Sequence, residues 1–229
     1  MLNFRDFGYK NVKKGLLFRS ASLSELSPED QNMLMENNIR TIVDLRGLDE
    51  RTAKPDTQIS GIENLSIPLS VIGSAKPTIY RGLRLPNLID CYHQLVAIDL
   101  KETWSRIFDL LLNSDDGVLF HCSQGKDRAG LLAYVLEIAL GVSKEDVKAD
   151  YLRSNVAMKV RIAYHMDELK NEPFYDEQYE KSLIDVFSAK EEYLDHAISE
   201  VEKKYESMEN YITKALCVDV EKLRALYIE

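Results

Sequence analysis

The sequence predicts an α/β protein with a central, mostly parallel sheet flanked by helices and with extra helices towards the C-terminus. Strand and helix signals alternate up to about residue 156, and helical patterns dominate after it. A chain of 229 residues with 45% hydrophobic content can bury one sizeable core. We therefore expect a single domain over residues 1–229, in which residues 1–156 form the sheet core and residues 157–229 form helices packed on it.

The first strand signals enclose one helix. Leu16–Ser20 is a short apolar run that ends in polar residues, as expected of a strand. Ser27 can cap a helix that begins at Pro28 and stops near Asn37. The mostly apolar, β-branched run Thr41–Leu45 is typical of a strand that is covered on both faces.

The middle of the chain leads to a second buried strand. Ile62–Leu69 is a weaker strand candidate, and Ser70–Pro86 carries the glycine, proline and serine of a loop. In Lys101–Leu112 the apolar residues recur at helical spacing, so this segment is predicted to be a helix with a buried face. Val118–His121 is predicted to be a buried strand that leads directly into Cys122.

The remainder of the chain is predicted to be helical. Gly130–Leu140 is apolar nearly all round, as in a buried helix. Ser143 can cap a further helix, which we expect to run towards Asn155. From there to Glu229 the chain is charged and helical in pattern. One helical face in this part carries Val201, Tyr205, Met208 and Ile212.

The overall charge limits the classes of partner. The formal net charge is -9 and the sequence pI is about 5.1, so the chain is not a basic protein that binds nucleic acid or anionic membranes non-specifically. An anionic ligand therefore needs a local cationic pocket. No apolar stretch approaches the ~18 residues of a membrane span, so stable membrane insertion is not expected. The oligomeric state is not predicted by these features.

The cysteines indicate a reducing compartment. Cys91, Cys122 and Cys217 are odd in number and widely spaced, without the Cys-x-x-Cys pair of zinc or redox sites. The N-terminus lacks the apolar run of a secretory signal. We expect a cytoplasmic protein with free thiols, although export without a cleavable signal is compatible with the same sequence.

The segment His121 to Gly130 carries the candidate chemistry. Cys122 precedes Arg128 by six positions, between a predicted buried strand and a predicted buried helix. Cys91 and Cys217 have no arginine at that offset. The alternative interpretation of Cys122 is a buried small apolar residue, but a core requires neither the glycine nor the Lys-Asp-Arg sequence that follows.

The spacing suits the binding of an anion. Five residues can wrap so that successive backbone N–H groups point at one anion, while the next helix presents its positive N-terminus. Gly125 eases the tight curvature, and Arg128 offers a planar fork for two phosphate oxygens. The same field is expected to stabilise a thiolate at Cys122, poised for in-line attack on phosphorus. His121 is predicted to support the loop by hydrogen bonding, because strand alternation points it away from Cys122.

This loop resembles the P-loop of cysteine-based tyrosine phosphatases. The sequence His-Cys-x-x-Gly-Lys-Asp-Arg is similar to that of the atypical bacterial tyrosine/phosphoinositide phosphatase family. Other segments that resemble the family are Asn3-Phe4-Arg5-Asp6, Leu17-Phe18-Arg19-Ser20, Asp44-Leu45-Arg46 and Asp150-Tyr151-Leu152-Arg153-Ser154-Asn155. The resemblance implies a dual-specificity-phosphatase-like fold and hydrolysis of phosphotyrosine, with phosphoserine, phosphothreonine or phosphoinositides as further substrates in some members. It implies no metal and no cofactor.

The resemblance also implies roles for the loop residues. Cys122 would form a phosphocysteine intermediate, and Lys126 would add positive charge beside the substrate. Arg128 and the backbone of the loop would bind phosphate. The predicted phosphate-binding residues are Ser123, Gln124, Gly125, Lys126, Asp127 and Arg128.

Three carboxyl groups are candidates for the acid that protonates the leaving oxygen. Asp127 lies within the loop, as the acid does in myotubularin-like phosphatases, and we favour it. The alternative for Asp127 is an ion pair with a nearby arginine that only fixes the loop. Asp90 and Asp99 lie upstream, where conventional tyrosine phosphatases carry their acid, but neither has a recognisable motif around it. Asp90 fits a solvated helix face.

Two further expectations concern the surroundings of the loop. Asp44 and Arg46 end a predicted parallel strand, so they either border the pocket or form a structural ion pair. Ala129 occupies the position where many family members place Thr or Ser to help the cysteine leave. The missing hydroxyl predicts a slower second step, by roughly tenfold.

The sequence therefore predicts a cysteine-dependent phosphatase that acts on phosphorylated proteins. A phosphoinositide phosphatase is the first alternative, although the net charge of -9 does not favour approach to an anionic bilayer. The second alternative is a phosphate-binding module without turnover. A rhodanese-type sulfur transferase also cradles a cysteine in an anion-binding loop, but its loop generally lacks the Lys-Asp-Arg sequence.

Overall fold

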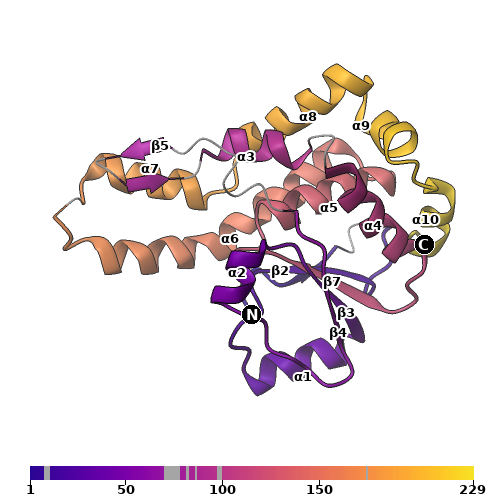
Figure 1. Ribbon diagram of the computed structural model, residues 1–229, viewed down its shortest axis with the longest axis horizontal. Helices are drawn as coiled ribbons and strands as arrows, with labels where there is room; N and C mark the ends of the chain where they lie inside the picture. Colours follow the sequence, from indigo (N-terminus) through magenta and orange to yellow (C-terminus); the bar gives the residue numbers. More distant parts are fainter. Residues whose placement is uncertain (8–10, 70–77, 81–82, 86, 97–99, 174) are drawn as a thin grey trace.

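A sheet forms the centre of the protein, and β7 is its middle strand. The computed structural model describes residues 1–7, 11–69, 78–80, 83–85, 87–96, 100–173 and 175–229 (Figure 1). Within these ranges the main sheet has five strands in the order β1-β2-β7-β3-β4. Their bounds are Arg5–Asp6 for β1, Leu17–Ser20 for β2, Ile39–Asp44 for β3, Glu63–Ser66 for β4 and Gly117–His121 for β7. All neighbouring strands are parallel except β1 and β2.

Every residue of β7 is buried, because the sheet is covered on both faces. Side chains alternate along the strand, so Val118 and Phe120 belong to one apolar cluster and Leu119 belongs to another. The larger cluster lies between the sheet and several helices, and the smaller one includes Leu34 of helix α1. A continuous apolar run is the sequence signature of such a strand.

The helices cover the sheet and extend beyond it. They are α1 (Pro28–Glu36), α2 (Leu48–Ala53), α3 (Leu88–Leu95), α4 (Lys101–Leu112), α5 (Arg128–Ala139), α6 (Lys144–Leu169), α7 (Glu177–Phe187), α8 (Glu191–Tyr205), α9 (Met208–Asn210) and α10 (Val220–Tyr227). A π-helical turn, Tyr211–Ala215, follows α9. Strands β5 (Thr78–Tyr80) and β6 (Leu83–Leu85) form a separate antiparallel pair.

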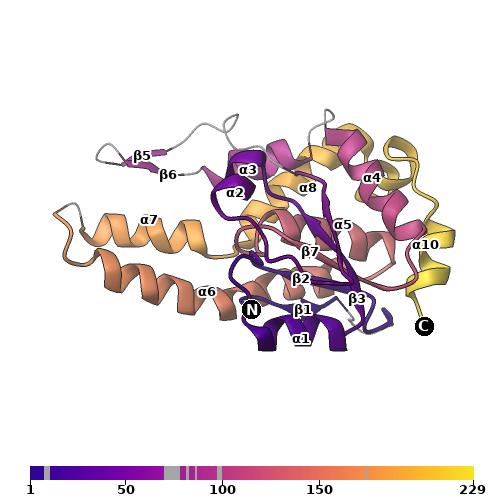
Figure 2. The ribbon, with the colours of Figure 1, turned by 60° about the horizontal axis from the view of Figure 1, so that its bottom comes forward.

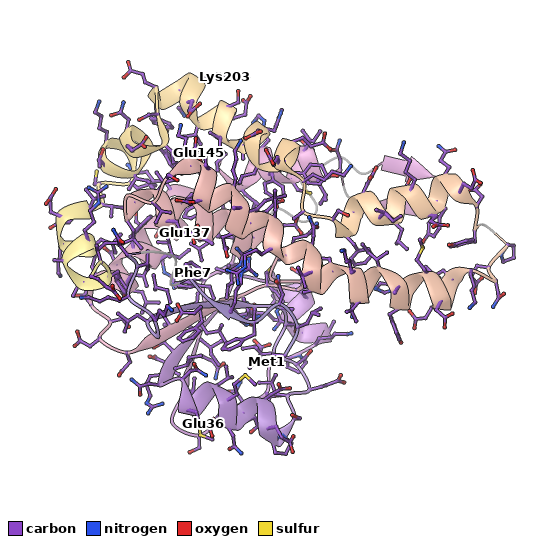
Figure 3. All side chains as sticks on the ribbon, turned by 180° about the vertical axis from the view of Figure 1, so that it is seen from behind. Met1, Phe7, Glu36, Glu137, Glu145 and Lys203 are labelled. Carbon is purple, nitrogen blue, oxygen red and sulfur yellow. The ribbon has the colours of Figure 1, made fainter. Side chains whose placement is uncertain are left out.

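Helix α5 is buried from Ala129 to Ala139, as its uniformly apolar sequence predicts. Its one charged residue beyond the first position is Glu137, which lies inside the protein, whereas Glu145 and Lys203 lie at the surface (Figure 3). Burial, followed by the nearby charge of Asp150, raises the pKa of Glu137 well above its ordinary value. Its carboxyl group is therefore accommodated without charge.

Helices α6 and α7 pack against each other and project together from the body of the protein (Figures 1 and 2). The outer part of α6 exposes Val156, Val160 and Tyr164. None of the helices in the described ranges combines the length and the apolarity of a membrane span.

Most of the predicted elements are confirmed. Ser27 caps α1 through its hydroxyl, and α4 has the predicted bounds. The predicted end of a helix near Asn155 is wrong, because α6 continues to Leu169. No glycine or proline marks a helix end near Asn155. The apolar residues beyond it are exposed, so they form no periodic buried face from which the continuation of the helix could be predicted.

The structure leaves two other predictions open. The predicted loop Ser70–Pro86 lies mostly outside the described residues, apart from β5 and β6. The assignment of residues 1–229 to one domain stays a prediction.

Candidate active site

The Cys122 loop lies at the carboxyl end of the central strand. Residues 122–127 connect β7 to α5, and Cys122 is only 2% exposed. Neighbouring strands β2 and β3 run parallel to β7, so their carboxyl ends approach the same edge of the sheet. This edge is where ligands bind in open parallel sheets.

Gly125 permits the sharp turn of the loop. Its φ is +66°, in the left-handed region that side chains disfavour. A Cβ atom at this position would lie 2.4 Å from the carbonyl oxygen of Ser20. Both the backbone conformation and the close approach of β2 therefore require glycine.

Side chains from the N-terminal segment hold the loop carbonyls on its outer side. The Arg19 Nη2 atom donates hydrogen bonds to the carbonyl oxygens of Gly125 at 2.8 Å and Lys126 at 3.3 Å. The Asn3 side-chain amide donates to the carbonyl oxygens of Gln124 at 3.2 Å and Gly125 at 3.0 Å. Carbonyls held outwards leave the amide groups of the same peptides to face inwards, which is the geometry of an anion-binding nest.

Arg19 is fully buried, and its charge is balanced by Asp150 of α6. The Asp150 carboxylate lies 3.1 Å from Arg19 and 3.1 Å from Arg5. Burial lowers the pKa of Arg19 to about 10, so the guanidinium stays charged at neutral pH. Breaking such a buried pair from one side typically costs about 3–5 kcal/mol. Gly130 leaves space for this guanidinium, because a Cβ there would lie 2.8 Å from Arg19 Nη2.

Arg128 forms a two-pronged ion pair with Glu50 of α2. Its Nη1 and Nη2 atoms donate to the two Glu50 oxygens at 2.5 Å and 2.8 Å. The Ser123 hydroxyl also donates to Glu50. Although burial acts in the opposite direction, the hydrogen bonds from Arg128 lower the pKa of Glu50 to about 2. Glu50 therefore fixes the guanidinium plane at the start of α5.

The sequence analysis did not single out Glu50. The available signal was local, because Glu50 Oε2 accepts from the Gly47 N–H in a capping-box arrangement at the start of α2. Its pairing with Arg128, 78 positions away, depends on the tertiary fold.

Lys126 and Asp127 form an ion pair at 3.1 Å, but their hydrogen-bond partners and their exposure differ. The Lys126 side chain is fully buried, and its Nζ atom donates to the carbonyl oxygens of Val186 and Ser188 at 2.8 Å and 3.0 Å. The Asp127 side chain is 26% exposed and accepts a hydrogen bond from Tyr92 Oη at 3.0 Å. Direct contact of Lys126 with phosphate, and the acid role of Asp127, stay predictions.

Asp44 and Arg46 form the ion pair that was one of their two predicted roles. Arg46 binds both Asp44 oxygens at 2.9 Å and 2.8 Å, and it also binds Asp56 at 2.8 Å. His121 Nε2 lies 2.9 Å from Asp56 and is fully buried beneath the loop. Of these two residues, Arg46 also lines the pocket beside Ser123 and Asp44 does not, so the rim role of Asp44 stays a prediction.

Two groups of side chains in the described residues have metal-ligand spacing. Asp44, Asp56 and His121 form one, but the Arg46 guanidinium already forms ion pairs with both carboxylates. The other comprises His93, His196 and Glu200 on α3 and α8. Neither group contacts Cys122 or Arg128 through a hydrogen bond or ion pair in these ranges.

The other candidate residues lie outside the loop. Asp90 is in the first turn of α3, and Asp99 lies outside the described residues. Burial, with a smaller effect of the Asp127 charge, raises the pKa of Cys91 to about 11, so this thiol stays protonated at neutral pH. Cys217 is exposed near the C-terminus. The Ala129 methyl group is fully buried at the start of α5.

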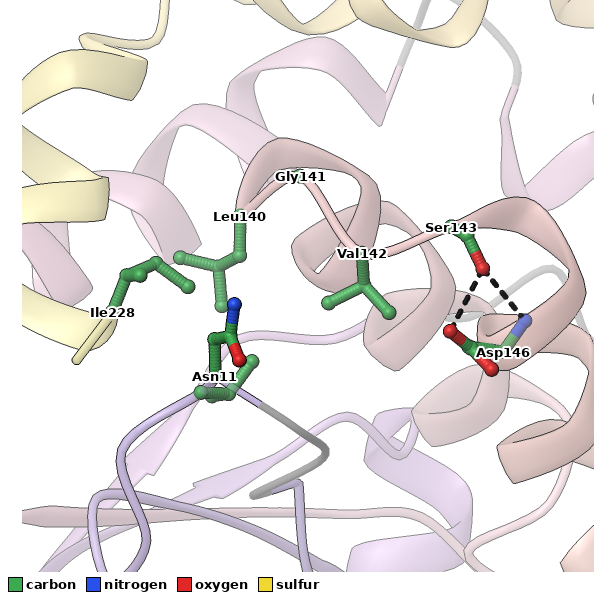
Figure 4. A pocket seen from close by; sticks show the side chains of 8 residues that line it. Asn11, Leu140, Gly141, Val142, Ser143, Asp146 and Ile228 are labelled. Carbon is green, nitrogen blue, oxygen red and sulfur yellow. Dashed lines mark hydrogen bonds between the residues drawn. The ribbon is translucent and has the colours of Figure 1, made fainter.

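A pocket of about 450 Å³ lies beside the loop and is lined by Ser123, Gln124 and Glu50 together with Lys54 and Arg161. A smaller hollow of about 260 Å³ lies at the opposite end of α5. Figure 4 shows that Ser143 and Asp146 cap α6 at its edge, with 2.8 Å and 3.2 Å hydrogen bonds. Only the first of these pockets adjoins the residues that surround Cys122.

Comparisons with known proteins agree on one family. A family model described as "Tyrosine phosphatase family" matches residues 1–229. A Cupriavidus necator protein named for tyrosine-protein phosphatase activity is 27% identical, over 96% of this chain and 81% of its own. The Mycobacterium tuberculosis protein named triple specificity protein phosphatase PtpB is 24% identical, over 93% of this chain and 91% of its own. Among solved structures, the core catalytic domain of the Saccharomyces cerevisiae PP-IP phosphatase SIW14 is similar, with 14% sequence identity and a TM-score of 0.37. The match covers 76% of this chain and 83% of the SIW14 chain.

The contact between Gly125 and β2 makes a prediction for stability. The Gly125→Ala variant is expected to lose about 3 kcal/mol of unfolding free energy, since it adds steric overlap to the cost of a left-handed backbone. Gly61→Ala is the matched control, because Gly61 has a φ of +83° but no atom within 4 Å of a Cβ. It is expected to lose only about 1 kcal/mol. Equal losses in denaturant unfolding would contradict the proposed contact.

The Glu50–Arg128 pair makes a prediction for the pH dependence of stability. The folded-state pKa of Glu50, about 2, lies below the ordinary value of 4.5, so its stabilisation is complete above about pH 5 and is lost as the pH falls towards 2. Glu50→Gln should therefore lower the melting temperature at pH 7, and the difference from wild type should shrink between pH 5 and pH 2.5. The exposed Glu63→Gln variant serves as control. A difference that is constant with pH would show that the charge is not responsible.

Proposed function

Since the chain belongs to the tyrosine phosphatase family, we propose that it hydrolyses phosphotyrosine-type monoesters through a phosphocysteine intermediate on Cys122. The observation that most supports this mechanism is the outward anchoring of the loop carbonyls by Arg19 and Asn3. Inward-facing amides, the N-terminus of α5 and Arg128 then converge on one dianion. In this proposal the amides of residues 123–128 bind the phosphate oxygens, and the buried charge of Lys126 adds to the positive field.

The first step is an in-line displacement at phosphorus. The Cys122 thiolate forms the S–P bond while the bond from phosphorus to the ester oxygen breaks. Asp127 gives a proton to the departing oxygen, so that the product leaves as a neutral alcohol or phenol. Arg128 follows the charge of the equatorial oxygens into the transition state, since its planar fork is held by Glu50.

The second step regenerates the enzyme. Water attacks the phosphorus, the S–P bond breaks, Cys122 leaves as a thiolate, and Asp127 takes the proton from the water. Ala129 offers no hydroxyl to the departing sulfur, so we expect this step to be slower than in family members with Thr or Ser, by roughly tenfold. The proposed reaction uses no metal and no cofactor.

A second candidate function is phosphoinositide hydrolysis, with the Cys122 loop again as the site of the reaction. It is favoured by one observation, the pair of cationic side chains Lys54 and Arg161 in the pocket beside Ser123. Neither forms an ion pair within the described part of the chain, so both are available to a second phosphate of a headgroup. The protein also has a net charge of -9, which opposes approach to an anionic bilayer.

The proposal is tested by phosphate release from a phosphotyrosyl peptide and from a soluble inositol polyphosphate. Wild type is expected to prefer the peptide, and Cys122→Ser is expected to release no phosphate from either. Arg128→Lys should lose about 100-fold or more in kcat/KM, because lysine cannot replace the bidentate fork. Cys217→Ser is the matched control and should keep full activity, since its thiol is exposed and remote.

Each outcome assigns a function. Preference for the inositide would favour the second candidate. Phosphopeptide binding by Cys122→Ser without turnover by wild type would indicate a binding module. Undiminished activity of Cys122→Ser would overturn the proposed nucleophile.

A further inference from the structure

The two carboxylate oxygens of Asp127 have different surroundings. Oδ1 lies 3.0 Å from the Tyr92 hydroxyl and 3.1 Å from the Lys126 ammonium. Within the described residues, Oδ2 accepts no hydrogen bond. The side chain is 26% exposed, so a substrate that reaches the loop can also reach this carboxyl group. The protein therefore tethers one oxygen and leaves the other available.

The Asp127 carboxylate sets the direction of the Tyr92 hydroxyl, and a second tyrosine lies beside that hydroxyl. Tyr92 of α3 is fully buried, and its oxygen lies 2.8 Å from that of Tyr151 on α6. The two rings meet edge to face at 6.4 Å. A buried hydroxyl needs partners, and a carboxylate oxygen can only accept. Tyr92 therefore donates to Asp127, and Tyr151 donates to Tyr92.

The Lys126 ammonium donates hydrogen bonds to two carbonyl oxygens, those of Val186 and Ser188. It also forms an ion pair with Oδ1 of Asp127 at 3.1 Å. The two carbonyl groups lie at the end of α7 and just after it. Lys126 thereby connects Asp127 to the helical hairpin of α6 and α7.

We propose that Tyr92 and Lys126 are positioning residues that fix Oδ1 of Asp127, so that Oδ2 carries the proton transferred to the leaving oxygen. This inference rests on the proposed function, in which Asp127 is the general acid. In the first step the Oδ2–H bond breaks as the ester oxygen gains the proton, and in the second step a proton from water returns to Oδ2. Tyr92 and Lys126 exchange no proton with the substrate, and their effect on the proton transfer acts through Asp127.

The leaving group reports on proton donation more directly than the overall rate does. 4-Nitrophenyl phosphate releases an acidic phenol that needs little protonation, whereas phenyl phosphate releases a much weaker acid. Loss of the acid should therefore slow phenyl phosphate far more than 4-nitrophenyl phosphate. A general loss of structure should slow both substrates by the same factor.

The test compares kcat and KM of three variants on these two substrates. Asp127→Asn should lose about 100-fold in kcat on phenyl phosphate, and much less on 4-nitrophenyl phosphate. Tyr92→Phe should lose about tenfold on phenyl phosphate and less than about twofold on 4-nitrophenyl phosphate, with KM unchanged. Tyr151→Phe is the matched control, because it removes the same atom from the neighbouring ring but keeps the bond from Tyr92 to Asp127. It should stay within about twofold of wild type on both.

The possible outcomes separate this inference from the proposed function. An equal loss on both substrates in Tyr92→Phe, or no loss on either, would overturn the positioning role while Asp127→Asn still shows the leaving-group effect. An equal loss on both substrates in Asp127→Asn would instead overturn the proposed acid. If Tyr92→Phe does not fold, Lys126→Met is measured in its place, because it removes the ion pair to Oδ1. The charge of Lys126 also contributes to the field at the phosphate, so both substrates should react more slowly, with the larger loss on phenyl phosphate. Equal losses on the two substrates would overturn the inference.

Discussion

The outward pull on the loop carbonyls is the interaction on which the rest of the site depends. Arg19 is fully buried and donates to two consecutive carbonyl oxygens, those of Gly125 and Lys126. A buried guanidinium is tolerated only with a counterion, and Asp150 of α6 supplies it at 3.1 Å. The nest that faces Cys122 is therefore maintained by charges placed behind it, on β2 and α6.

Separate contacts hold the side chains of two consecutive residues, Asp127 and Arg128, where the loop enters α5. On the Arg128 side, Glu50 binds both terminal nitrogens of the guanidinium and orients its plane. On the Asp127 side, Tyr92 and Lys126 connect the carboxyl group to α3 and to the end of α7. The Arg128 guanidinium, proposed to bind phosphate, and Asp127, the proposed acid, are thus held by contacts from different helices.

The sequence was sufficient to predict the strand, the loop and the helix that surround Cys122. The spacing of Cys122, Gly125 and Arg128 is local, and so are the apolar runs of β7 and α5. Glu50 could not be predicted because its partner is 78 positions away. The burial of Lys126 depends on carbonyl groups 60 and 62 positions away, and carbonyls leave no signal in a sequence. The length of α6 was also missed, because its outer half exposes apolar residues without a regular buried face.

The most direct test of the proposed chemistry is to find the covalent intermediate. Wild-type protein is mixed with a phosphotyrosyl peptide, quenched in acid within the first turnover, digested, and analysed by mass spectrometry. We expect phosphate on Cys122 and on neither Cys91 nor Cys217, and the slow second step expected from Ala129 should favour its accumulation. Rapid phosphate release with Cys122 unmodified throughout the first turnover would contradict a phosphocysteine mechanism.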